Sequence, residues 1–99
     1  MIIENQEYKV VALKEDDLGL ANSNDIKKII EKELSDGNKF IVLDLIGLNS
    51  INSAGLGVLI GILNKVKVQN GKLKMININE RIMNIFRITK LDLVFEINK

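Results

Sequence analysis

The apolar positions along the chain follow two spacings, either alternation or short continuous runs in some stretches and a repeat of three to four residues in others. The first pattern predicts strands, and it occurs in residues 1–4, 7–13, 40–45, 73–78 and 93–97. Residues 40–45 are apolar almost throughout, which is typical of a central strand covered on both faces. The turn-prone pair Asn5 and Gln6 predicts that the first two strands form a hairpin.

The repeat of three to four residues predicts three helices. The first covers about 24–35 with Asn22 or Ser23 as its cap, and the second covers 53 to about 68. The second is apolar nearly all round in its first two turns, so it must be covered on more than one side. The third follows a cap at Asn79. The apolar faces of the first and third helices consist of Ile26, Ile29, Ile30 and Leu34, and of Ile82, Ile85 and Phe86.

Strands and helices therefore alternate in the order β-β-α-β-α-β-α-β. This order predicts an α/β fold with a mostly parallel, right-handed central sheet, an N-terminal β-hairpin and helices packed on the sheet. The chain has 99 residues, no Pro and no linker, internal repeat or low-complexity tract. We therefore expect a single domain over residues 1–99.

Composition excludes several classes of function. A net charge of +1 and only four aromatic residues argue against nucleic-acid binding. The chain contains no His and no Cys, so serine hydrolases, thiol enzymes and zinc sites are not expected, and we predict no enzyme activity, no metal and no cofactor. The N-terminus lacks the pattern of a secretory signal, and the most apolar stretch, 54–63, is shorter than the roughly 20 residues that span a bilayer. We expect a cytoplasmic protein without membrane contact.

Ser53 lies where a loop gives way to the most apolar helix, in the stretch FIVLDLIGLNSINSAGLGVLIG. Backbone N–H groups at a helix start lack intrahelical partners, and the helix dipole favours a negative group there. Two interpretations follow. Ser53 is either only the helix cap or a phosphorylation site, where a phosphate would add roughly −1.5 to −2 charge at pH 7.

Small residues occupy the first turns of the same helix. Ala54, Gly57 and Gly61 share one face, which meets either the sheet or a partner protein, and we favour the sheet. The glycine string resembles a dinucleotide-binding loop only superficially, because its last spacing is one residue too long, and the chain has no triphosphate-binding loop either.

Carboxylates near this turn are expected to be structural. Asp44 ends the predicted central strand, and we expect it to accept backbone hydrogen bonds in the following turn rather than to act as a catalyst. The acidic run at residues 15–17 is predicted to be a solvated loop, and a position on the same side of the molecule as Ser53 is left open.

With these residues in hand, the chain resembles the STAS domain of bacterial anti-sigma-factor antagonists over essentially its whole length. The most specific likeness is VLDL at 42–45 followed by NSAGLGVL at 52–59. The later turn NGKL at 70–73 and the helix exit ITKLD at 88–92 resemble the family as well.

The resemblance implies a function and a partner. The family's antagonists bind a protein that is both anti-sigma factor and Ser/Thr kinase, free the sigma factor, and are switched off when the kinase phosphorylates the serine that corresponds to Ser53 here. Other STAS proteins are further expected partners. The expected partner-binding residues are Asn52, Ser53, Ala54, Gly55, Leu56, Gly57, Leu18 and Gly19.

Three positions depart from the family pattern. Asn52 stands where the family has Asp, Ala54 replaces a second Ser or Thr, and the loop at Gly19 lacks an Asp. Two carboxylates near the acceptor are therefore absent. This keeps an alternative open, in which the chain is a non-phosphorylated STAS scaffold or assembly module of a multi-protein signalling complex. A small nucleotide-binding protein is a third hypothesis, and it lacks every expected motif.

Overall fold

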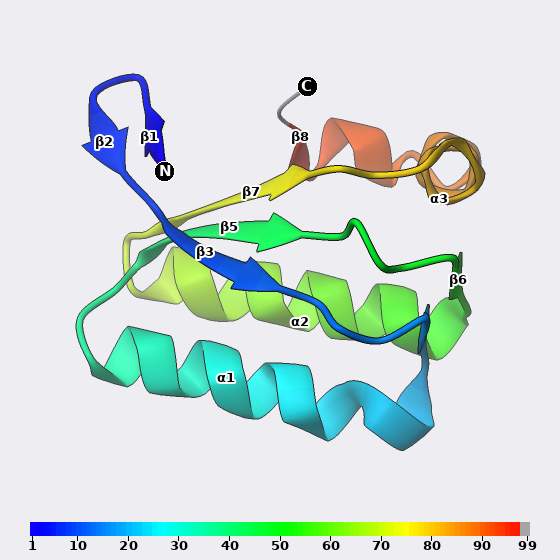
Figure 1. The fold of residues 1–99 in the computed structure, drawn as a ribbon, viewed down its shortest axis with the longest axis horizontal. Coiled ribbons are helices and arrows are strands. Elements are labelled where there is room, and N and C mark those ends of the chain that lie inside the picture. The colour runs from blue at the N-terminus through cyan, green and yellow to red at the C-terminus, as the bar shows by residue number, and fades with distance from the viewer. Residues whose placement is uncertain (98–99) are drawn as a thin grey trace.

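Four parallel strands form the central sheet of the computed structural model, which describes residues 1–97 (Figure 1). Their spatial order is β3-β5-β7-β8. The strands are β3 (Lys9–Ala12), β5 (Phe40–Asp44), β7 (Lys72–Ile76) and β8 (Glu96–Ile97). The apolar strand predicted at 40–45 thus occupies the interior of the sheet, and the expected α/β fold with a mostly parallel sheet is confirmed.

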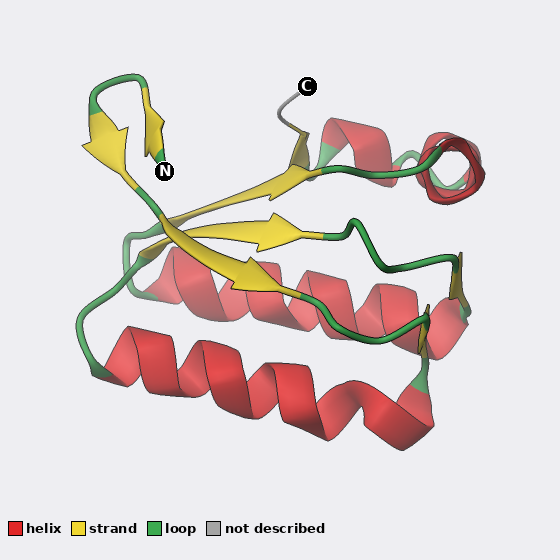
Figure 2. Ribbon diagram, viewed as in Figure 1, coloured by secondary structure: helices red, strands yellow, loops and turns green. Residues whose placement is uncertain are grey.

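Three helices connect these strands, as the sequence predicts. In Figure 2, α1 (Ser23–Ser35) and α2 (Ser53–Val68) lie side by side below the sheet, and α3 (Glu80–Ile88) lies above them beyond the end of β7. A short 3₁₀ helix, Leu20–Asn22, precedes α1. The predicted cap of α3 is confirmed, because the Asn79 side chain accepts a hydrogen bond from the Ile82 backbone N at 2.9 Å.

The core lies between the sheet and the pair α1 and α2. Parallel register places Val11, Leu43 and Met75 opposite one another on three adjacent strands, so their side chains share one face. All three are buried in one cluster with the inward side of α2, represented by Leu59 and Ile62. This packing explains why α2 is so apolar, since it meets both the sheet and α1.

One residue of the predicted apolar stripe of α1 is misplaced. Ile26 and Ile30 are buried, but Ile29 is 45% exposed. Consecutive helical residues are about 100° apart, so Ile29 and Ile30 cannot both face the same narrow contact with α2 and the sheet.

The predicted N-terminal hairpin is only partly right. Antiparallel pairing joins β1 (Ile2–Ile3) to β2 (Gln6–Glu7), but the rest of the predicted second strand becomes β3 and pairs in parallel with β5. The physical reason is burial: Val11 and Leu13 enter the core, whereas Ile2 in the hairpin remains 72% exposed.

The predicted last strand at 93–97 is shorter than expected. A 3₁₀ helix, Leu91–Leu93, occupies its beginning, and only β8 pairs with β7. Leu93 and Val94 are exposed, so they gain nothing from the sheet, while Phe95 is buried against Phe86 with ring centroids 5.3 Å apart.

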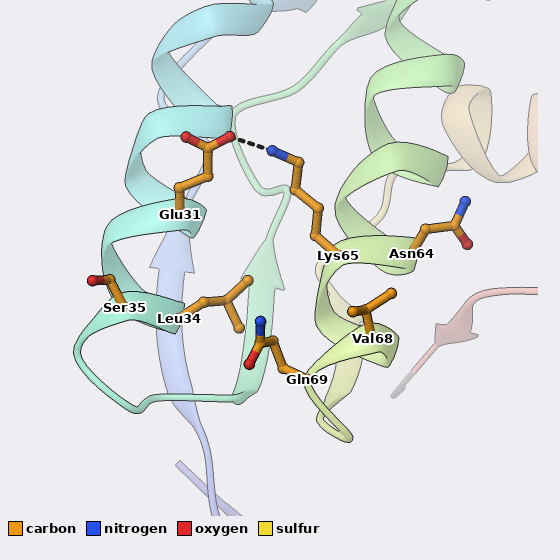
Figure 3. A pocket seen from close by; sticks show the side chains of 7 residues that line it. All are labelled: Glu31, Leu34, Ser35, Asn64, Lys65, Val68 and Gln69. Carbon is orange, nitrogen blue, oxygen red and sulfur yellow. Dashed lines mark hydrogen bonds and ion pairs between the residues drawn. The ribbon is translucent and has the colours of Figure 1, made fainter.

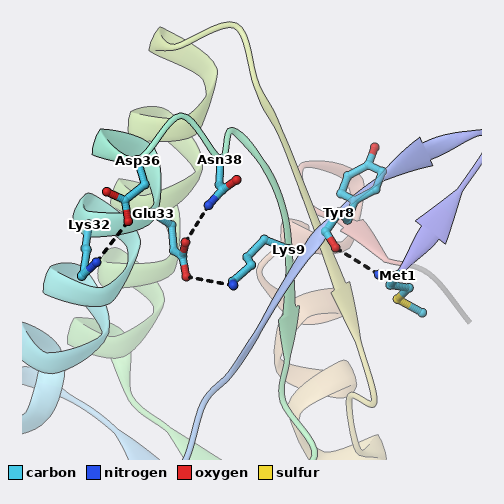
Figure 4. A network of polar contacts seen from close by, with 7 residues as sticks. All are labelled: Met1, Tyr8, Lys9, Lys32, Glu33, Asp36 and Asn38. Carbon is cyan, nitrogen blue, oxygen red and sulfur yellow. Dashed lines mark hydrogen bonds and ion pairs between the residues drawn. The ribbon is translucent and has the colours of Figure 1, made fainter.

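Polar contacts tie the edge strand to the end of α1 (Figure 4). Glu33 accepts a hydrogen bond from Asn38 at 2.9 Å and forms an ion pair with Lys9 of β3 at 4.0 Å. On the solvent side, a hydrogen bond to Asp36 raises the pKa of Lys32. These contacts lie at the end of the sheet opposite to the start of α2.

Candidate functional site around Ser53

Two very short strands bring distant parts of the chain together at the start of α2. β4 (Asp17–Leu18) pairs in parallel with β6 (Ser50–Ile51), and Leu18 lies opposite Ile51. The backbone O of Asp16 also accepts hydrogen bonds from the backbone N of Asn49 at 2.7 Å and of Ser50 at 3.2 Å. The predicted site residues Leu18 and Gly19 therefore lie next to Asn52 and Ser53.

Asn52, and not Ser53, caps α2. Asn52 has an extended backbone, and its Oδ1 accepts a hydrogen bond from the Gly55 backbone N at 2.9 Å. That is the geometry of an N-cap, whose side-chain oxygen binds an N–H three residues on. The interpretation of Ser53 as the cap is therefore wrong. Ser53 is the first helical residue, it is exposed, and its hydroxyl takes part in no hydrogen bond within residues 1–97.

Residues 17–19, which we call the β4 turn, lie directly on the start of α2. Two glycines make this close approach possible. A Cβ on Gly55 would lie 2.2 Å from the Leu18 backbone O, and a Cβ on Gly19 would lie 2.9 Å from Asn52 Nδ2. Gly19 has a φ of −155°, which any residue adopts, so space and not conformation requires the glycine. The backbone N of Asn52 also donates to Leu18 O at 3.3 Å. The turn and the helix start thus form one surface.

The expectation that Ala54, Gly57 and Gly61 face the sheet is wrong. A Cβ on Gly57 or on Gly61 would meet no atom within 4 Å. Together with Ala54 they line an open groove of about 360 Å³ between α1 and α2, flanked by Lys27. The reason is that the larger residues of α2 already occupy its sheet-facing side.

A second groove continues between the C-terminal halves of α1 and α2 (Figure 3). It measures about 600 Å³, and Leu34 and Val68 supply its apolar walls. Lys65 crosses it to form an ion pair with Glu31, and the hydrogen bond from Lys65 lowers the pKa of that carboxyl group. Lys65 also lines the first groove, so the two grooves meet at this residue, more than three helical turns from Ser53.

The neighbouring carboxylates have structural partners, as predicted. Asp44 Oδ1 accepts hydrogen bonds from the Ile46 backbone N at 3.1 Å and from Asn77 Nδ2 at 3.0 Å. Asp16 Oδ1 accepts one from Asn49 Nδ2, and Asp17 pairs with Ser50 in the β4 ladder. Asp16 and Asp17 therefore lie beside the segment that leads to Ser53, and the prediction of a loop is wrong for Asp17, which belongs to β4.

Two further observations limit the kinds of site. Among residues 1–97, no group of three His, Cys, Asp or Glu residues is placed to hold a metal ion. Within the same residues, no helix has the length and apolar character needed to cross a membrane.

Five of the eight predicted partner-binding residues lie close together in the structure. Leu18, Gly19, Asn52, Ser53 and Gly55 come together. The remaining predicted residues lie on the first two turns of α2, namely Ala54, Leu56 and Gly57, with Leu56 partly buried against the core.

Asn22 is the residue that was missed. It stands at the N-cap position of α1, as predicted, but its side chain makes no cap hydrogen bond to α1. The side chain instead binds the backbone of residues 17 and 19, and its bond to Gly19 is part of a capping box at the start of the 3₁₀ helix Leu20–Asn22. The available signal was the spacing of a capping box, in which the side chain three residues after the cap bonds back to the backbone N–H of the cap.

Comparisons with known proteins agree with this fold. A family model described as STAS domain matches residues 2–99. A candidate anti-sigma factor antagonist of Thermotoga neapolitana is 32% identical over 89 residues, which make up 89% of this chain and 79% of that protein. The anti-sigma-B factor antagonist of Bacillus subtilis is 42% identical over 48 residues, or 48% of this chain and 44% of that protein.

A solved structure is also similar. The crystal structure of a candidate anti-sigma factor antagonist from Thermotoga maritima matches with a TM-score of 0.78 and 30% identity, over 91% of this chain and 79% of that one. The resemblance predicted from the residues is confirmed, and this chain belongs to the STAS domain family.

Proposed function

We propose that this chain is an anti-sigma-factor antagonist, a regulatory protein without enzyme activity that binds an anti-sigma factor through the surface around Ser53. The names of its relatives support the general function. The composite surface supports the location, because residues 17–19 and the first turns of α2 are held together by backbone contacts.

The observation that carries the proposal is the free hydroxyl of Ser53. It is exposed at the first position of α2, and it makes no hydrogen bond within residues 1–97 because Asn52 does the capping. A kinase therefore meets no structural cost in modifying it. We propose that the anti-sigma factor is also a Ser/Thr kinase and that it phosphorylates Ser53.

Phosphorylation would change the surface but not the fold. A phosphate adds roughly −1.5 to −2 charge at pH 7, and a helix N-terminus accepts such a charge favourably. The surroundings are already acidic, since Asp16 and Asp17 belong to the adjoining turn. An interface adapted to the unmodified serine would then have to accommodate an additional anion, and each loss of about 1.4 kcal/mol is tenfold in affinity.

The experiment incubates the chain with the anti-sigma factor and Mg²⁺-ATP, and locates phosphate by mass spectrometry. We expect a complex and modification of Ser53. In binding assays Ser53→Ala should bind like the unmodified chain, and Ser53→Asp at least about tenfold more weakly. Ser35→Asp is the matched control, because Ser35 is exposed at the far end of α1. The proposal would be ruled out if neither a complex nor modified Ser53 were detected.

A second candidate is a non-phosphorylated scaffold or assembly module that binds other STAS proteins. The specific observation in its favour is the open face of α2, where a Cβ on Gly57 or Gly61 would meet nothing. This function predicts stable self-association or co-purification with other STAS proteins. A strict monomer that captures a sigma-regulating kinase would count against it.

A further inference from the structure

The side chain of Asn22 closes the turn that follows β4. Its Oδ1 accepts a hydrogen bond from the Gly19 backbone N at 2.9 Å, and its Nδ2 donates to the Asp17 backbone O at 2.6 Å. A single half-buried amide thus holds two backbone groups that are two residues apart. Asn suits this position because it offers a donor and an acceptor at once.

The turn so closed is the one that lies on α2. Leu18 O accepts a hydrogen bond from the Asn52 backbone N and sits where a Cβ on Gly55 would fall, and Gly19 lies against the Asn52 amide. The clearance between turn and helix is smaller than a methyl group at both glycines. A small displacement of the turn would therefore change the shape of the surface beside Ser53.

We propose that Asn22 is a positioning residue of the partner-binding surface. By fixing Asp17 and Gly19 to each other it sets where the β4 turn lies relative to the first turn of α2, without itself needing to touch the partner. The part of this proposal that concerns the partner rests on the proposed function. The part that concerns the turn can be measured in the isolated chain.

The test compares Asn22→Ala and Asn22→Asp with wild type. Asn24→Ala is the matched control, because Asn24 is exposed in the first turn of α1, two residues after Asn22, and makes no side-chain hydrogen bond within residues 1–97. Amide exchange is followed by NMR. In Asn22→Ala, exchange at the Gly19 amide should rise roughly three- to tenfold, the equivalent of one lost hydrogen bond, while the amides of β5 keep their protection. Asn22→Asp keeps the acceptor for the Gly19 N–H but loses the donor to the Asp17 backbone O, so it should protect Gly19 less well than wild type and better than Asn22→Ala.

Binding of the anti-sigma factor is measured on the same proteins. We expect Asn22→Ala to bind about tenfold more weakly and Asn24→Ala to bind like wild type. Unchanged exchange at Gly19, or an equal loss of protection in β5, would overturn the positioning role. Faster Gly19 exchange with unchanged affinity would overturn it as well. If even the wild-type chain binds no anti-sigma factor, the proposed function fails, and exchange at Gly19 alone then decides whether Asn22 holds the turn.

Discussion

Two glycines that lie two residues apart on α2 have opposite surroundings. One is required by packing, and the other is free to serve in binding. A Cβ on Gly55 would overlap the Leu18 backbone O, whereas a Cβ on Gly57 would enter open space. Since backbone cannot move aside as a flexible side chain does, Gly55 is fixed by the fold. Within residues 1–97, no neighbouring atom prevents Gly57 from carrying a side chain.

Gly55→Ala should therefore destabilise the chain by about 1 to 3 kcal/mol, the usual cost of overpacking. The methyl group must push the β4 turn away from α2, because the distance to Leu18 O is only 2.2 Å. Urea unfolding followed by circular dichroism measures the change. A Gly55→Ala chain as stable as wild type would show that the turn does not rest on the helix.

Gly57→Ala, in contrast, should make the chain more stable. Alanine is favoured over glycine inside a helix by about 1 kcal/mol, and nothing obstructs the added methyl group. If Gly57 lies in the partner-binding surface, the same methyl group should weaken binding while the fold is strengthened. Gly61→Ala, one turn further along α2, is the control, with the same gain in stability and unchanged binding. Unchanged binding by Gly57→Ala would remove this residue from the proposed surface.

At the level of elements, the contact between α1 and α2 carries an ion pair across their outer groove. The hydrogen bond from Lys65 lowers the pKa of Glu31 below its ordinary value of 4.5. A carboxyl group with a lowered pKa in the folded chain adds stability that is fully present above its unfolded pKa. That stability is lost as the pH falls through the lowered value.

Glu31→Gln should therefore be slightly less stable than wild type at neutral pH, and the two should become equally stable in acid. Both side chains are exposed, so the effect is small and decreases with added salt. Urea midpoints measured from neutral to acidic pH test this. If the urea midpoints of Glu31→Gln and wild type still differed in acid, the substitution would disturb packing and not charge.

The sequence predicts the helices of this fold better than its short strands. The helices were found within a residue or two, because a repeat of three to four residues over a dozen positions is a strong signal, and α2 begins at Ser53 as expected. β4 and β6 have two residues each and carry no periodicity, so they were missed. Their pairing is what brings Leu18 and Gly19 to the site, and only the resemblance to a family had indicated it. The side-chain hydrogen bonds of Asn22 and Asn52 are instead local, spanning three to five residues, so the sequence did carry a signal for them.

At the level of the whole molecule, the parallel sheet decides where the site lies. All three helices follow strands of the central sheet, so they begin at the edge where those strands end (Figure 1). Ligands of open α/β sheets gather at this edge. The first turns of α1 and α3 carry Asp25 and Glu80, as suits the positive end of a helix dipole. Ser53 itself is exposed, so we expect a modification of its side chain to change this surface and to leave the core unchanged.

The most direct test of the central claim is a titration of the anti-sigma factor with unmodified and Ser53-phosphorylated chain, followed by calorimetry at fixed salt. We predict that the unmodified chain binds, and that the phosphorylated chain binds at least about tenfold more weakly while its thermal unfolding stays within a few degrees of wild type. Equal affinity of the two forms would contradict the claim that the charge on Ser53 controls binding.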